Sequence, residues 1–222
     1  MSTFFLIVNR VDKAKEEMSN IVSNTNEAIA VSTLVNYVGQ SQRLYNKGEE
    51  VSGATDVITD YLRLNYLWQE IRVLAGAYGA FNVVNENMGL YSLLTYRDPN
   101  YIETLDVFNA VPDTLISIAS DLRENPKALE LSIIASIASL DGSVLSAEQM
   151  GWTSFERWIT RTTSASRQKW RDGILSTTPE DFEEFANRLV NSTGSVTTAT
   201  VCSDAAFEIA NLTIPLERVK VN

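Results

Sequence analysis

The chain has 222 residues, enough to bury a substantial core in one large domain or two small ones. Its formal net charge of -10 argues against a nucleic-acid-binding surface, because affinity for phosphates comes mainly from Lys and Arg side chains that displace counterions. The chain has no histidine, which excludes a histidine-ligated zinc site, a Ser-His triad and a Cys-His dyad within it.

The sequence also argues against a disulfide scaffold and a membrane segment. Cys202 is the only cysteine and cannot form an internal disulfide, so we expect a buried, inert thiol. The apolar run at residues 4–8 is far shorter than the roughly 20 residues that a membrane-spanning helix needs, and no basic signal-peptide pattern accompanies it. We therefore expect a protein that is neither membrane-bound nor secreted.

The opening of the chain predicts two strands with a helix between them. Residues 3–9 form a short apolar run that suits a buried strand, and Asp12 follows as the N-cap of a helix. Residues 28–37 are rich in Val, Ile and Thr, which predicts a second, longer strand that reaches a turn at residues 46–48.

A long helix is expected over residues 54–74. Apolar residues that recur at helical spacing mark its expected buried face: Val57, Tyr61, Leu64, Trp68 and Ile71. Gly76 is placed to end this helix, since glycine readily adopts the left-handed conformation that follows a helix C-terminus. Two β-like segments, residues 78–84 and 89–96, then flank a polar turn and predict an antiparallel hairpin.

Helices are expected to dominate from residue 98 onward, with Pro112 interrupting the first of them. Asn125 with Pro126 begins another helix by the cap-then-proline rule, and residues 146–149 have the form of a capping box. Candidate core residues of the first helical segment are Leu105, Phe108, Val111 and Leu115. Further helices are expected at about residues 153–162, 165–174 and 178–190.

A final strand is expected at residues 195–202. The order of strands, helices and a last strand predicts an α+β fold, with helices packed on one face of a largely antiparallel sheet. No short repeat is visible, and no Pro/Gly/Ser linker separates the helical block from the hairpin. We therefore expect a single domain over residues 1–222.

Three stretches of the sequence carry a family resemblance: NYVG at residues 36–39, RVLAGAYG at 72–79 and SLLTYRDPN at 92–100. In this order they resemble the C-terminal unit of the presequence proteases, which are zinc metallopeptidases of the insulinase/pitrilysin type (inverzincins). Weaker similarity continues to residue 178, so the resemblance covers most of the chain.

The resemblance implies a large peptidase in which four homologous α+β units form two halves around a chamber. Zinc would be bound in the first unit by an inverted H-x-x-E-H motif, which a chain without histidine cannot contain. No metal site is therefore expected in this chain. The zinc cofactor would lie in the missing N-terminal catalytic half of the same polypeptide, which would be this chain's partner.

The resemblance also implies the site residues. Arg72 and Tyr78 match the arginine and tyrosine that reach the scissile carbonyl of a peptide substrate, where a fixed donor stabilises the negative charge that develops on oxygen. Gly76 and Gly79 would form part of the substrate-binding surface, because glycine allows close approach of a backbone. Residues 75 and 80 are alanines where the family usually has paired glycines.

From the residues alone, Arg72 would instead complement the helix dipole, and Tyr78 would be a core residue. For the stretch RDPN a structural interpretation is favoured, in which Asp98 or nearby residues cap a helix and Arg97 pairs with a neighbouring carboxylate. Trp152 and Trp158, near Phe155 in the sequence, are interpreted as core residues or as a face between units.

Two functions follow as hypotheses. The first is a substrate-binding, transition-state-stabilising C-terminal domain of a zinc metalloendopeptidase that degrades short unstructured peptides, such as targeting presequences, and is inactive alone. The resemblance places such an enzyme in a mitochondrial or other organellar lumen, or in the cytoplasm. The second is a non-catalytic structural or assembly subunit with the same fold, since fold alone does not determine function.

Overall fold

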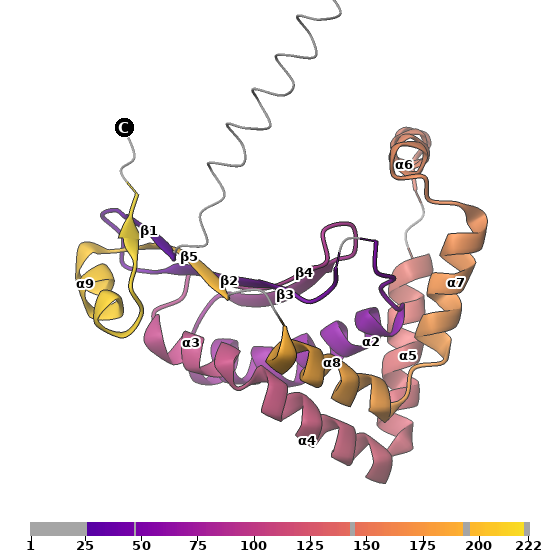
Figure 1. The fold of residues 1–222 in the computed structure, drawn as a ribbon, viewed down its shortest axis with the longest axis horizontal. Helices are drawn as coiled ribbons and strands as arrows, with labels where there is room; N and C mark the ends of the chain where they lie inside the picture. Colours follow the sequence, from indigo (N-terminus) through magenta and orange to yellow (C-terminus); the bar gives the residue numbers. More distant parts are fainter. Residues whose placement is uncertain (1–25, 47, 143–144, 193–195, 220–222) are drawn as a thin grey trace, which may run out of the picture.

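The computed structural model describes residues 26–46, 48–142, 145–192 and 196–219. The strand predicted at residues 3–9 and the helix expected after Asp12 lie outside these residues. In the described part, a six-stranded sheet packs against a layer of helices (Figure 1). The single domain expected over residues 1–222 stays a prediction.

The strands follow the spatial order β3-β4-β2-β5-β1-β6. Their bounds are β1 (Glu27–Ala30), β2 (Tyr37–Arg43), β3 (Gly79–Asn85), β4 (Leu90–Tyr96), β5 (Thr197–Cys202) and β6 (Glu217–Arg218). The β3-β4, β4-β2 and β2-β5 pairs are antiparallel, whereas β1 runs parallel to both β5 and β6. The predicted hairpin, the late strand and the mixed α and β character are confirmed.

The single long strand predicted at residues 28–37 was wrong. β1 ends at Ala30, which pairs with Cys202 of β5, and β2 begins at Tyr37, which pairs with Val201 on the opposite side of the same strand. The chain therefore has to leave the sheet and cross β5 between these two residues. A composition rich in Val, Ile and Thr indicates a β-strand, but it does not show where one strand ends and the next begins on the other edge of β5.

Helices account for most of the remaining described chain. Their bounds are α2 (Ala54–Leu62), η1 (Arg63–Leu74), α3 (Ile102–Asn109), α4 (Val111–Glu124), α5 (Pro126–Asp141), α6 (Ala147–Thr160), α7 (Ser164–Leu175), α8 (Pro179–Asn191) and α9 (Asp204–Thr213). Figure 1 shows α2, α3, α4 and α8 below the sheet, as predicted for a sheet covered on one face. The elements α9 and β6 were not predicted.

Several predicted helix starts are confirmed in detail. Ser146 and Gln149 form the capping box at the start of α6, in which each side chain bonds to the other residue's backbone N–H. Pro112 lies in the first turn of α4, directly after the break between α3 and α4. Pro126 opens α5 in the same way, because a missing N–H costs nothing at a helix N-terminus.

The long helix predicted before the hairpin is confirmed, but its second half, η1, is a π-helix. Its hydrogen bonds run from i to i+5, so each turn holds more residues than the 3.6 of an α-helix. Buried residues therefore recur every four or five positions, at Leu62, Leu67 and Ile71. Leu64 and Trp68, which α-helical spacing placed on the buried face, are exposed.

The core lies between the sheet and the helix layer. Tyr91 of β4 packs edge-on against Phe185 of α8, with ring centroids 5.3 Å apart. The four core candidates of the first helical segment are all buried, as is Cys202. Burial, reinforced by the Asp204 carboxylate, raises the pKa of the Cys202 thiol, which suits the unreactive cysteine that was predicted.

In the described part of the chain, the opposite face of the sheet is open over β3 and β4. Four large apolar or aromatic side chains of these two strands are exposed there: Phe81, Val83, Leu94 and Tyr96. Strand alternation places them on the side away from the buried Tyr91 and Leu93. None of the described helices is long and apolar enough to span a bilayer.

Candidate functional site

Arg72 and Tyr78 lie together at the junction between η1 and β3. The Nη1 atom of Arg72 donates a hydrogen bond to the backbone carbonyl oxygen of Tyr78 at 2.6 Å. The guanidinium carbon lies 5.4 Å from the centroid of the Tyr78 ring. The Tyr78 side chain is 61% exposed, so this residue is not part of the core. The junction thus brings the two predicted donors together on the surface.

Trp68 is a third member of this group. It lies one turn before Arg72 in η1, and its ring centroid is 4.3 Å from the guanidinium carbon. The cation therefore contacts two aromatic faces, each contact worth about 0.5–1 kcal/mol at exposed positions. No carboxylate of the described chain forms an ion pair with Arg72. Its charge is held in place without being neutralised.

The turn between the two donors depends on Gly76. Its φ of +81° is the left-handed conformation that glycine adopts without steric cost, and the Ala77 N–H closes the helix end by donating to the Ile71 oxygen at 3.0 Å. Its role as a helix terminator is confirmed. Neither Ala75 nor Ala80 has a positive φ, so alanine is compatible with both positions.

Gly79 is buried, and the structure shows what occupies the space beside it. A Cβ atom at this position would lie 3.0 Å from Cζ of Phe81, closer than ordinary contact. The missing side chain therefore makes room for the Phe81 ring. Gly76 is exposed, and a Cβ there would meet nothing nearer than the Pro99 ring at 3.9 Å. The substrate-binding role of both glycines stays a prediction.

The three stretches that carry the resemblance converge here. Asn36 and Asp98 form a β-bridge with backbone hydrogen bonds of 2.6 and 2.8 Å, which ties the first stretch to the third. Asn100 Nδ2 donates to the Ala75 carbonyl oxygen at 2.6 Å, which ties the third stretch to the end of η1. Segments far apart in the sequence thus fix the helix end that carries Arg72.

The Asp98 carboxylate is fully buried and anchors this arrangement. It accepts hydrogen bonds from the Asn100 backbone N–H at 2.9 Å and from Thr104 Oγ1 at 2.6 Å, which fixes the turn before α3. The predicted helix cap at Asp98 was wrong, because the N-cap of α3 is Tyr101, and Asp98 instead holds the turn before it. The ion pair expected for Arg97 was wrong within the described residues, because its guanidinium instead lies over the Tyr96 ring at 5.6 Å.

Aromatic rings continue from the donors across the open face of the sheet. Tyr78 contacts Tyr96 with ring centroids 5.6 Å apart, and Tyr96 contacts Tyr37 at 5.5 Å, both edge-on. We call Trp68, Tyr78, Tyr96 and Tyr37 the aromatic strip. Sequence reasoning assigned no role to Tyr37 and Tyr96, although both lie inside the resembling stretches, and it placed Trp68 on the buried face, although Trp68 stands at i-4 from Arg72.

The chain's residues do not fit a zinc site. In the part of the chain that the structure describes, no group of three or more His, Cys, Asp or Glu could hold a metal ion. Zinc in proteins prefers nitrogen and sulfur ligands, and this chain offers no histidine and a single, buried cysteine. The chemistry of the site is therefore that of hydrogen-bond donors and aromatic surfaces.

Comparisons with known proteins show the family and the fold. The family model of the PreP C-terminal domain matches residues 26–203. The chain is 37% identical over 164 residues to presequence protease 1, chloroplastic/mitochondrial, of Arabidopsis thaliana, covering 74% of this chain and 15% of that protein. It is 30% identical over 178 residues to Protein HypA of Clostridium perfringens, covering 80% of this chain and 18% of HypA. The chain thus spans less than a fifth of these relatives.

Solved structures share the fold at low sequence identity. Pitrilysin matches with a TM-score of 0.59 and 14% identity, over 80% of this chain and 19% of pitrilysin. A peptidase M16 inactive domain from Pseudomonas fluorescens matches with a TM-score of 0.56 and 11% identity, over 81% of this chain and 43% of that domain's chain. With the family match extending over most of its length, the chain belongs to the family of presequence protease (PreP) C-terminal domains.

Proposed function

We propose that this chain is the substrate-binding, transition-state-stabilising C-terminal domain of a zinc metalloendopeptidase that degrades short unstructured peptides, such as cleaved targeting presequences. An N-terminal catalytic half of the same polypeptide supplies the zinc, its ligands and the general base, and the chain alone is inactive. Family membership and the small share of the relatives that the chain spans support this proposal. The compartment is an organellar lumen, as the name of the Arabidopsis relative indicates for that protein, or the cytoplasm.

The observation that carries the proposal is the adjacency of Arg72 and Tyr78 on an exposed surface. Hydrolysis of a peptide bond develops negative charge on the carbonyl oxygen, and a preorganised donor stabilises that charge by about 3 kcal/mol. Arg72 uses one N–H on the Tyr78 carbonyl and retains others for a substrate. Within the described residues, nothing bonds to the Tyr78 hydroxyl, which is free to donate to the same oxygen.

The aromatic strip provides a binding surface for the rest of the peptide. An unstructured peptide has no core of its own, so its apolar side chains are available to pack against exposed rings. The strip begins at the donors and extends along the open face of β4 and β2, so a peptide held on it has its backbone beside Arg72 and Tyr78. Binding on the strip then positions the scissile carbonyl at the donors.

The alternative is a non-catalytic structural or assembly subunit with the same fold. A purely structural subunit has no use for an arginine without a carboxylate partner beside an exposed phenol. The unneutralised charge of Arg72 therefore favours the peptidase function.

Complementation tests the proposal. The N-terminal part of the parent polypeptide, produced separately, is mixed with this chain, and zinc-dependent cleavage of a fluorogenic presequence peptide is measured. We expect the chain to restore cleavage and Arg72→Ala to lower kcat/KM about 100-fold, because about 3 kcal/mol of charge stabilisation is lost. Lys127→Ala is the control, since it removes an exposed cation from the start of α5, outside the site.

Circular dichroism melting of each variant separates loss of function from loss of fold. Full activity in Arg72→Ala would remove the proposed role of this residue. A chain that binds the catalytic part tightly and never restores cleavage would establish the assembly subunit instead.

A further inference from the structure

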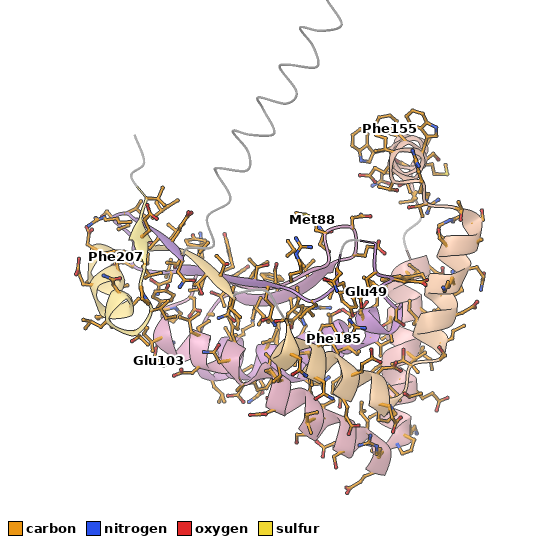
Figure 2. All side chains as sticks on the ribbon, viewed as in Figure 1. Glu49, Met88, Glu103, Phe155, Phe185 and Phe207 are labelled. Carbon is orange, nitrogen blue, oxygen red and sulfur yellow. The ribbon has the colours of Figure 1, made fainter. Side chains whose placement is uncertain are left out.

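Helix α6 carries large apolar side chains that pack against nothing in the described chain. None of its residues is buried. Trp158 is 75% exposed, and three further large apolar side chains on the same helix are also exposed. Figure 1 shows α6 standing away from both the sheet and the helix layer. Figure 2 shows Phe155 on this isolated helix, apart from the side chains of the main body. Exposure of this kind marks an interaction surface more often than a solvated one.

The apolar residues of α6 share one side of the helix. Their spacing of three and four residues places Trp152, Phe155, Trp158 and Ile159 together, and we call these four residues the aromatic face of α6. Ring contacts confirm the arrangement, since the ring centroids of Trp152 and Phe155 are 5.7 Å apart and those of Phe155 and Trp158 are 6.2 Å apart. Large, preorganised aromatic side chains are typical anchors of protein interfaces.

The sequence specifies this helix at both ends, even though no tertiary packing stabilises it. The capping box of Ser146 begins it, and Arg161, with a φ of +58°, ends it by donating its N–H to Arg157. A helix of 14 residues without a packed face is marginal in water, because most helix stability in proteins comes from packing. Strong end signals on an unsupported helix indicate that a partner completes it.

We propose that the aromatic face of α6 docks on the remaining part of the peptidase polypeptide. The family model includes α6, so the helix belongs to the domain that these enzymes share. The chain spans only 15% and 18% of its relatives, so much more protein surrounds this domain there. This inference rests on one part of the proposed function, namely that this chain belongs to a longer polypeptide. It does not require Arg72 or Tyr78 to act in catalysis.

Both acidic and basic residues surround the aromatic face of α6. Glu156 accepts a hydrogen bond from Trp152 Nε1 at 2.8 Å, and Glu148 stands one turn before Trp152 on the same side of the helix. Helical spacing places Arg157, which forms no ion pair within the described residues, on the opposite side. The complementary surface is therefore an apolar patch with polar residues of both charges at its border. The chain's net charge of -10 disfavours an anionic membrane as the occupant.

Binding of this chain to the separately produced remainder tests the proposal. Isothermal titration calorimetry of the double variant F155S/W158S should show affinity at least about 100-fold weaker than wild type, because two aromatic anchors are lost. Leu212→Ser, on the exposed side of α9, is the matched control and should bind as wild type does. The melting temperature of the double variant should be unchanged, since none of its replaced side chains is buried.

Hydrogen exchange on the full-length polypeptide gives a second measurement. It does not require the rest of the polypeptide to fold without this chain. Residues 147–160 should exchange fast in this chain and slowly in the full-length protein. Equal exchange in both, or equal binding by the double variant, would overturn the docking surface whatever the activity. Full activity of Arg72→Ala with normal binding would instead contradict only the proposed function.

Two other results would also overturn the proposal. Sedimentation velocity would show a second copy as the occupant if this chain dimerises alone and the double variant is monomeric. Cosedimentation with vesicles containing phosphatidylserine, abolished in the double variant, would identify a lipid surface instead.

Discussion

The guanidinium of Arg72 owes its position to neighbours on two sides. Tyr78 contacts it from the residue before β3 and Trp68 from the preceding helical turn, so its long side chain has little freedom to move away. A catalytic donor acts best when its position is set before the reaction begins, because no reorganisation is then required as charge develops.

We expect Trp68→Ala to lower kcat/KM of the complemented enzyme about fivefold, as about 1 kcal/mol of cation–π support is lost. Trp68→Phe, which keeps an aromatic face, should restore most of the activity. A purely structural role for Trp68 would not require an aromatic ring at this position. The Trp68 side chain is 45% exposed, so folding should change little. The control is Leu64→Ala, one turn earlier and also exposed; an equal loss of activity there would contradict the positioning role.

How much of the site the sequence predicted depends on the residue. Arg72 and Tyr78 follow from the resemblance, and their adjacency follows from a helix that ends in Gly76 directly before a strand. Trp68 was assigned to the buried face, because α-helical spacing does not anticipate the wider turn of η1. Arg97 was expected to pair with a carboxylate, but the backbone turn that aims it over Tyr96 depends on the distant Asn36.

At the scale of elements, prediction succeeded where local chemistry decides. Proline and capping residues located the starts of α5, α6 and α8, and Pro112 located the break before α4, since these signals act within one turn of the chain. Prediction failed where a distant partner decides. The crossing from β1 to β2 is set by the position of β5, which lies far along the sequence and leaves no mark on the residues between them.

The contact between the start of α2 and helix α7 is a close approach of two backbones. A Cβ atom at Gly53 would lie 2.0 Å from the carbonyl oxygen of Trp170, and a Cβ at Gly173 would lie 2.8 Å from the Gly53 nitrogen. Backbone atoms cannot move aside as a flexible side chain can. Both glycines are therefore required for α7 to pack against α2.

We expect Gly53→Ala to lower the free energy of unfolding by about 3 kcal/mol, at the upper end of the usual cost of overpacking. Urea denaturation followed by circular dichroism measures the change. The matched control is Gly151→Ala within α6, where a Cβ meets nothing within 4 Å, so its stability should not fall. A Gly53→Ala protein as stable as wild type would show that the two helices do not approach this closely.

For the whole molecule, the absence of histidine makes a prediction about metal. We expect the isolated chain to bind no zinc with useful affinity, because a single buried cysteine and surface carboxylates do not form a tetrahedral nitrogen and sulfur site. Added zinc should leave its melting temperature unchanged, and the chelator EDTA should have no effect. Stoichiometric zinc in the purified chain, or a zinc-dependent rise in melting temperature, would contradict this.

The sheet also has a consequence for how the protein is made. Among the described strands, β1, at residues 27–30, pairs only with β5 and β6, at residues 197–202 and 217–218. During synthesis β1 leaves the ribosome long before either partner exists, so its edges stay unpaired while the helical layer emerges. Such high contact order slows folding and lengthens exposure to aggregation, which makes this domain a natural client for chaperones.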